Sequence, residues 1–280
     1  MSHVEDNQVN ELPLLAENYP LSIEQRESYQ RDGHIVLRGV ASDAEIASYE
    51  PIITDWVKSL NEQDKPLEQR DTYGKAFIQI SNLWEKSEEI QRFVFAKRFA
   101  QIAADLMGVD GVRIYHDQAL FKEPHGGHTP WHQDQNFWPL DTDKTITMWM
   151  PLVPISEEVG SMTFASESHL IGYINRLLIS DESHRTLAGY IEGKGFKTVS
   201  HGAMQAGDAT FHAGWTLHSA PGNPTDTMRK VMTIIYYADG SRVAEPDSKA
   251  RENDLKRWFP DMKPGDVAAS VLNPLLYSRE

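Results

Sequence analysis

The sequence contains no cysteine, and that absence excludes several kinds of site at once. Disulfide bonds, thiolate nucleophiles and cysteine-based zinc sites all require this residue. The chain also lacks any apolar run long enough to cross a bilayer as a helix. We therefore expect a protein that does not insert into a membrane and whose chemistry relies on histidines, carboxylates and other polar side chains.

Basic charge is also scarce. The chain has 27 lysines and arginines against 41 aspartates and glutamates, which gives a formal net charge of −14. General binding to nucleic acids or anionic membranes needs a basic surface, so we expect neither. Residues 1–8 are polar and acidic and lack the features of a secretory signal, so the expected location is the cytoplasm. The expected partner is a small-molecule substrate, and the expected state is a monomer or a homodimer.

The length of 280 residues and a hydrophobic content of 40% are sufficient for one substantial core, so we predict a single domain. Residues 1–20 are predicted to form a loose arm and residues 21–108 a mostly helical support. Short strand-like runs separated by turn residues fill residues 109–240, and residues 241–280 add a helix and a tail. The predicted fold class is mainly β with flanking helices: a jelly roll, or cupin-like double-stranded β-helix, behind an N-terminal helical section.

Capping residues predict where the first helices begin. Ser22–Gln25 and Ser42–Glu45 both fit a capping box, and Gly33 is a suitable end for the first of the two helices. In the second helix, Pro51 should kink or split the helix because proline cannot donate the helical hydrogen bond. The other expected elements are helices at 87–107 and 247–258 and strands at 34–38, 112–121, 145–153, 162–164, 196–200, 209–211 and 228–237.

The segment Trp131–Asp134 contains the first candidate site residues. On an extended strand, His132 and Asp134 point to the same face, so an imidazole and a carboxylate can approach one point. His218, on a distant strand, could complete a set of two histidines and one carboxylate. Non-haem Fe(II) oxygenases use such a set on one face of the metal and leave the opposite positions open. Arg229, eleven residues after His218, could hold a dicarboxylate co-substrate bidentately.

The other histidines leave alternatives. His212 is a rival to His218 as the third ligand, but its longer spacing to Arg229 favours a supporting or packing role instead. His125 and His128 fit a solvated loop better than ligation, although contact with substrate at the mouth of the site is a weaker alternative. His169 fits a structural hydrogen bond.

Strand alternation separates Arg229 from its neighbour Lys230. If Arg229 faces inward, every second residue from Val231 to Tyr237 faces inward too, and these residues are suitably apolar. Lys230 would then point outward.

Five stretches of the chain follow one another in a recognisable order. They are Gln30–Arg38, Lys122–Pro124 with Trp131–Asp134, Gly160–His169, Gly207–Phe211 with His218, and Asn223 with Met228–Lys230. Together they resemble the phytanoyl-CoA dioxygenase family of Fe(II)- and 2-oxoglutarate-dependent oxygenases. A His-x-Asp pair alone is a weak signal, but the ordered set at these spacings is specific.

The resemblance implies roles for particular residues. His132, Asp134 and His218 would bind Fe(II), and Arg229 would pair with the far carboxylate of 2-oxoglutarate. Three further residues would contact the co-substrate: Trp149, Thr129 and Gln79. The implied cofactors are Fe(II), 2-oxoglutarate and O2, with ascorbate as an accessory reductant.

Three positions qualify the resemblance. Ala220 stands where members often have a serine that helps the arginine bind the co-substrate, so Arg229 or a water must supply the contact that this serine makes. Glu167 stands where family members usually have glycine, so the backbone geometry of that turn could differ from the family's. Halogenating relatives have a small residue at the position of Asp134, so the carboxylate predicts hydroxylation or a related oxidation such as desaturation or ring formation.

Aromatic residues near the ligands are candidates for the substrate pocket. Trp138, Phe137 and Trp215 lie close to the ligands in sequence, although such residues usually just fill the core. They favour a small organic substrate with apolar character, oxidised with release of succinate and CO2. Two other interpretations stay open: a jelly-roll metal enzyme without 2-oxoglutarate, such as an isomerase, or a non-catalytic metal- or ligand-binding sensor.

Overall fold

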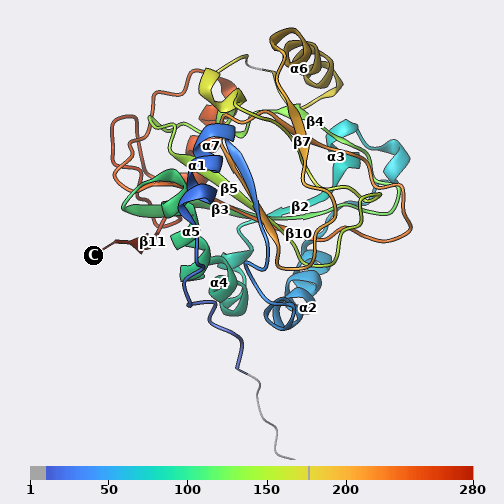
Figure 1. Cartoon of the computed structure of the whole chain (residues 1–280), viewed down its shortest axis with the longest axis horizontal. Helices are drawn as coiled ribbons and strands as arrows, with labels where there is room; N and C mark the ends of the chain where they lie inside the picture. The colour runs from blue at the N-terminus through green and yellow to red at the C-terminus, as the bar shows by residue number, and fades with distance from the viewer. Residues whose placement is uncertain (1–10, 176, 280) are drawn as a thin grey trace, which may run out of the picture.

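The computed structural model describes residues 11–175 and 177–279, and its strands form two antiparallel sheets (Figure 1). The major sheet runs in the order β1 (His34–Leu37), β8 (Ala209–Ala213), β5 (Thr145–Pro151), β10 (Val231–Ala238), β3 (Gly111–Phe121) and β11 (Leu275–Ser278), with β2 (Ile78–Ser81) also paired to β3. The minor sheet runs β4 (Thr129–His132), β9 (His218–Ala220), β6 (Thr163–Ala165) and β7 (Thr198–Ser200). The predicted mainly-β jelly roll is confirmed, although neither sheet closes on itself.

Seven α-helices surround the sheets in the described part of the chain. They are α1 (Ile23–Asp32), α2 (Asp43–Leu60), α3 (Thr72–Ala76), α4 (Glu88–Val94), α5 (Lys97–Met107), α6 (Asp181–Lys194) and α7 (Lys249–Trp258). Helices α2, α4 and α5 cover one face of the major sheet, which we call its outer face (Figure 1). Side chains such as Phe93 and Phe99 pack there against Ile114, Met148 and Ile234 from the strands. The opposite face of the major sheet, its inner face, is turned toward the minor sheet.

Both predicted capping boxes are present. Ser22 and Gln25 cap α1, and Ser42 and Glu45 cap α2, each pair through reciprocal side-chain and backbone hydrogen bonds. Gly33 ends α1 in the left-handed region, at φ 78°. Any side chain there would also place its Cβ 2.3 Å from Nδ1 of His169, so only glycine fits.

Two helix predictions differ from the structure in detail. Of the kink or split expected at Pro51, the split does not occur, because α2 is one helix from Asp43 to Leu60. Buried side chains on both sides of the proline hold the two halves in the same core, which compensates for the missing hydrogen bond. The single helix expected at 87–107 is two helices, because the backbone leaves helical geometry at Ala96, where ψ is 121°.

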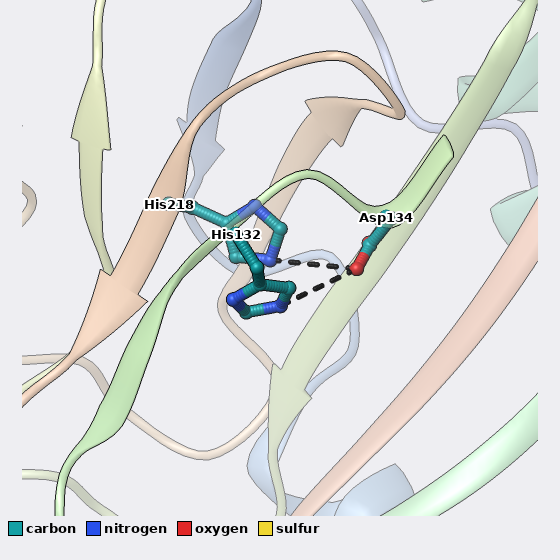
Figure 2. Close-up of side chains that lie close together, drawn as sticks. All are labelled: His132, Asp134 and His218. Carbon is teal, nitrogen blue, oxygen red and sulfur yellow. Dashed lines mark ion pairs between the residues drawn. The ribbon is translucent and has the colours of Figure 1, made fainter. Parts of the chain in front are cut away.

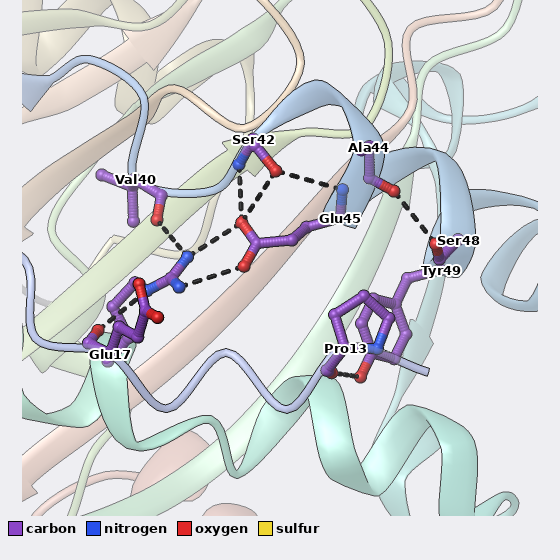
Figure 3. A network of polar contacts seen from close by, with 9 residues as sticks. Pro13, Glu17, Val40, Ser42, Ala44, Glu45, Ser48 and Tyr49 are labelled. Atoms are coloured by element: carbon purple, nitrogen blue, oxygen red, sulfur yellow. Dashed lines mark hydrogen bonds and ion pairs between the residues drawn. The ribbon is translucent and has the colours of Figure 1, made fainter. Parts of the chain in front are cut away.

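The arm predicted to be loose is packed in its described part. Within residues 11–20, the hydroxyl of Tyr49 on α2 donates to the carbonyl of Pro13 (Figure 3). Arg98 on α5 donates Nε to the carbonyl of Glu17 at 2.9 Å. This segment is therefore part of the helical layer; the rest of the predicted arm lies outside the described residues.

The expected strands are present with shifted ends, and several elements were not predicted. β2, β11, α3 and α6 were missed, although Ser180 and Ser183 form a capping box that signals α6. Glu167 adopts φ 68°, so the turn that usually takes glycine keeps its left-handed geometry here. His169 makes the structural hydrogen bond that was expected, from Nε2 to the carbonyl of Gln30 at 3.2 Å. No helix in the described ranges is long and apolar enough to cross a membrane.

Candidate active site

His132, Asp134 and His218 come together on the inner side of the minor sheet (Figure 2). His132 ends β4 and is the direct partner of His218 on β9. Asp134 is not on the strand; it opens a short 3-10 turn, and the extended backbone of Gln133 still turns it toward His132. Oδ1 of Asp134 lies 3.5 Å from Nε2 of His132 and 3.6 Å from Nε2 of His218.

Backbone carbonyls fix the orientation of both imidazoles. Nδ1 of His132 donates to the carbonyl of Pro130 at 2.7 Å, and Nδ1 of His218 donates to the carbonyl of Thr216 at 2.9 Å. Each Nε2 is then left unprotonated and directed at the common point, as a metal-binding histidine requires. Burial, followed by the neighbouring His132 and His212, lowers the pKa of His218 well below its usual value, which keeps it neutral.

The carboxylate of Asp134 is held by its other oxygen. Oδ2 accepts hydrogen bonds from Oγ1 of Thr147 at 2.9 Å and from Nε2 of His212 at 3.1 Å. Burial acts to raise the pKa of Asp134, but the surrounding His218, His132 and His212 outweigh it and hold that pKa well below the usual range. The group is therefore an ionised ligand with Oδ1 free. His212 lies in the supporting position that was favoured for it.

Two imidazoles and one carboxylate are a donor set suited to Fe(II) with open positions on the opposite side. The ligand atoms of the three residues all lie within 4.8 Å of one another. In the described part of the chain, they are the one group of three such residues that could hold a metal ion.

Arg229 lies in the same cavity and is almost fully buried, at 2% exposure. Its guanidinium lies over the ring of Trp149 at 5.4 Å and donates from Nη1 to the carbonyl of Gly160 at 3.3 Å. Nε has no hydrogen-bond partner among the described residues, and burial alone lowers the pKa of Arg229 to about 10. A buried cation in this state is a site for an anion. Lys230 points to the opposite side and pairs with Glu50 on α2.

Lys122 is a second buried cation beside Arg229 and was quoted in the sequence motif without a role. The two residues exchange backbone hydrogen bonds of 2.8 and 2.9 Å, so their side chains lie on the same face. Nζ of Lys122 donates to the carbonyl of Gly127. Burial and the neighbouring Arg229 lower the pKa of Lys122 to about 6.

The cavity has a volume of about 570 Å³ and receives side chains from both sheets. Of the remaining candidate residues, those that line it are Gln79, Thr129, Phe137, Trp138 and Trp149. Trp215 is not among the lining residues; its ring packs edge-on against Tyr173 at 6.2 Å. Oγ1 of Thr129 and Nε of Arg229 are both buried without a hydrogen-bond partner among the described residues. Such a pair of atoms is suited to a ligand rich in oxygen.

Sequence reasoning missed several lining residues. Tyr73 donates to Oε1 of Gln79 at 2.8 Å, and His116, Asp254 and Trp258 line the far end of the cavity. None of them belongs to a recognisable motif, and α7, which carries the last two, is far from the ligands in sequence.

The sequence matches the family description "Phytanoyl-CoA dioxygenase (PhyH)" over residues 29–231. The chain belongs to the phytanoyl-CoA dioxygenase family. A curated relative is the human peroxisomal phytanoyl-CoA dioxygenase, which is 20% identical over 264 residues, covering 85% of this chain and 74% of that protein.

Two solved structures are similar in fold and sequence. The carbocyclase SnoK from nogalamycin biosynthesis is 25% identical, with a TM-score of 0.74 over 91% of this chain and 96% of the other. The epimerase SnoN, in complex with Fe3+, alpha ketoglutarate and nogalamycin RO, is 25% identical, with a TM-score of 0.70 over 90% and 96%. This member of the phytanoyl-CoA dioxygenase family is an iron- and 2-oxoglutarate-dependent oxygenase of a small molecule.

Proposed function

We propose that His132, Asp134 and His218 bind Fe(II) and that Arg229 binds the far carboxylate of 2-oxoglutarate. The observation that carries this proposal is the buried guanidinium of Arg229, which pairs with no carboxylate of residues 11–175 and 177–279 and lines the same cavity as the three ligands. Burying a cation costs free energy, and a dicarboxylate ligand would offset that cost. An isomerase or a sensor that binds no dicarboxylate would lack this compensation.

Other residues complete the co-substrate site. Thr129 is the direct cross-strand partner of Ala220, so its unpaired hydroxyl faces the place of the serine that family members often carry there. We infer that Thr129 supplies the hydrogen bond that Ala220 cannot. Trp149 stacks on the guanidinium, and Gln79 lines the same cavity.

The reaction we propose is hydroxylation, desaturation or ring closure of a substrate with apolar character. When bound, iron, 2-oxoglutarate and O2 supply the oxidising power for C–H oxidation, and 2-oxoglutarate leaves as succinate and CO2. The protein orients the ligands through the carbonyls of Pro130 and Thr216, keeps Asp134 ionised, and excludes water with Trp138 and neighbouring aromatic side chains. A cytoplasmic location and a monomer or homodimer remain predictions.

Anaerobic titration with Fe(II) and 2-oxoglutarate tests the proposal. We expect a weak visible charge-transfer band in the wild type and its loss in His132→Ala and Asp134→Ala. His125→Ala is the matched control, because this histidine is exposed and pairs only with Asp226 among the described residues. If either ligand variant kept the band and full iron affinity, the assignment would be wrong. Succinate release in a substrate screen then distinguishes an oxygenase from a sensor.

A further inference from the structure

The cavity has two chemically different ends. Arg229 gives one end a positive charge. The other end is formed by strand β3 and the C-terminal helix α7, with His116, Asp254 and Trp258 among its lining residues. The proposed function leaves this second end, which we call the α7 end, without a ligand.

A β-bulge in β3 shapes the α7 end. Ile235 on β10 pairs with His116, but the next residue, Tyr236, pairs with Ile114, so Tyr115 is an extra residue. A bulge interrupts strand alternation and re-aims side chains. Ile114 consequently packs in the core of the outer face, while both Tyr115 and His116 lie on the inner side.

Two polar anchors fix α7 over the cavity. The hydroxyl of Tyr115 donates to Oδ2 of Asp254 at 2.7 Å. Arg251 donates to the carbonyls of Gln135 at 3.1 Å and Asn136 at 3.3 Å, directly after the ligand Asp134. The helix is thus tied both to the bulge and to the turn that carries a metal ligand, and it forms a fixed wall.

His116 has an unused polar atom at this wall. Its ring packs on the indole of Trp258, with centroids 4.5 Å apart, and is only 5% exposed. Nδ1 is buried and has no hydrogen-bond partner within the part of the chain that the structure describes. Burial lowers the pKa of His116 to about 3, so the ring is neutral near pH 7. A buried, unpaired nitrogen is costly unless a ligand satisfies it.

Charge is balanced at the α7 end. Among the described residues that line the cavity, Asp254 is the carboxylate at this end, and burial raises its pKa to about 6. Arg257 sits at the exposed rim, over Trp258 at 4.3 Å, and offsets it. The excess positive charge, that of Arg229, lies at the opposite end, where the far carboxylate of the proposed co-substrate would neutralise it. A charged substrate would therefore find no uncompensated partner at the α7 end.

We propose that the α7 end is the substrate site and that it takes an uncharged ring compound with hydroxyl or carbonyl oxygens, one of which bonds to His116. This inference rests on the proposed function for the location of the iron and co-substrate. Trp138 and Trp258 give this end an apolar wall for the ring, and the cavity volume of about 570 Å³ lies in the usual range for small-molecule pockets.

Calorimetric binding of three matched probes tests the inference on the full chain with Fe(II) and 2-oxoglutarate, under anaerobic conditions. The probes are 6-hydroxy-1-tetralone, 1-tetralone and the anion 5,6,7,8-tetrahydro-2-naphthoate. We expect the hydroxy ketone to bind most tightly and the carboxylate at least about tenfold more weakly than it. His116→Phe should weaken the hydroxy ketone about fivefold, which is the size of one hydrogen bond. Part of that loss should return in His116→Gln, and Lys256→Gln on the same helix is the neutral control.

The outcomes separate the two proposals. If the charge-transfer band of Fe(II) with 2-oxoglutarate is absent, the proposed function fails first. If the band is present but no probe binds, or the carboxylate binds best, the inference about the α7 end is overturned. Equal weakening by His116→Phe and Lys256→Gln would likewise remove His116 from substrate recognition.

Discussion

Replacing Arg229 by methionine tests whether this buried cation exists for a ligand or for the fold. Burial lowers its pKa from 12.5 to about 10, which corresponds to a penalty of about 3 kcal/mol in the unliganded protein at neutral pH. The contacts with Trp149 and Gly160 return about 1–2 kcal/mol of that. We therefore expect Arg229→Met to leave the unliganded protein equally stable or more stable by about 1–2 kcal/mol.

The same substitution should remove most of the response to 2-oxoglutarate. Loss of a charge-assisted hydrogen-bonded pair costs about 1.5–3 kcal/mol, which weakens binding more than tenfold. At a ligand concentration one hundred times the wild-type Kd, ligand stabilisation of about 2.7 kcal/mol should fall to about 1.4 kcal/mol or less. Urea unfolding of the metal-loaded protein, with and without 2-oxoglutarate, measures both quantities.

Lys230→Met is the matched control, because Lys230 is adjacent in sequence but pairs with Glu50 on the opposite side. It should lower stability slightly and leave the stabilisation by 2-oxoglutarate unchanged. The reasoning is refuted if Arg229→Met destabilises the unliganded protein by more than about 2 kcal/mol, a loss typical of a structural residue. Equal losses of ligand response in the two variants would also refute it.

Three further predictions concern other parts of the molecule. For the wild type in chloride, mass spectrometry of the products should show oxygen insertion or hydrogen removal and no halogenation. Asp134→Gly should mainly lose activity, because a vacant metal position does not build a halide site. A halogenated main product of the wild type would contradict the role given to Asp134. Lys122 has a pKa of about 6 in the unliganded protein, so binding of the 2-oxoglutarate dianion above pH 6 should take up a proton and weaken as pH rises. Calorimetry in buffers of different ionisation enthalpy measures this proton uptake, which should be absent in Lys122→Met. Unchanged uptake in Lys122→Met would show that another group takes up the proton. Arg98→Met should destabilise the fold by about 1–2 kcal/mol, as judged by urea unfolding, because it removes the charged hydrogen bonds to the half-buried Glu45. Burial acts to raise the pKa of Glu45, but its hydrogen bonds to Arg98 and Ser42 lower it overall, so the loss should be full above about pH 4.5 and fade in more acid solution.

Local rules carried much of what was predicted correctly. The capping boxes at Ser22 and Ser42 involve residues three apart, so their hydrogen bonds are set by the chain itself. The same holds for His132 and Asp134, which need only one extended residue between them. His218 lies far away in sequence, and it was found because the family motifs occur in a fixed order.

Errors arose where packing between distant segments decides the structure. Nothing in residues 87–107 marks the break at Ala96, which follows from the packing of α4 and α5 on the sheet. Trp215 is close to His218 in sequence, yet its ring packs against Tyr173 and is not among the described residues that line the cavity.

Residue types at short or recognisable spacings were enough to predict the class of fold and to propose the donor set and the cation for a dicarboxylate. Only the tertiary structure placed Lys122 beside Arg229, and Asp254 of α7 against the bulge at Tyr115. Both arrangements join segments that are distant along the chain, and a one-residue change in strand register decides which side chains face the cavity. Burial, which sets the charge state of these groups, likewise exists only after the two sheets and the helices have packed together.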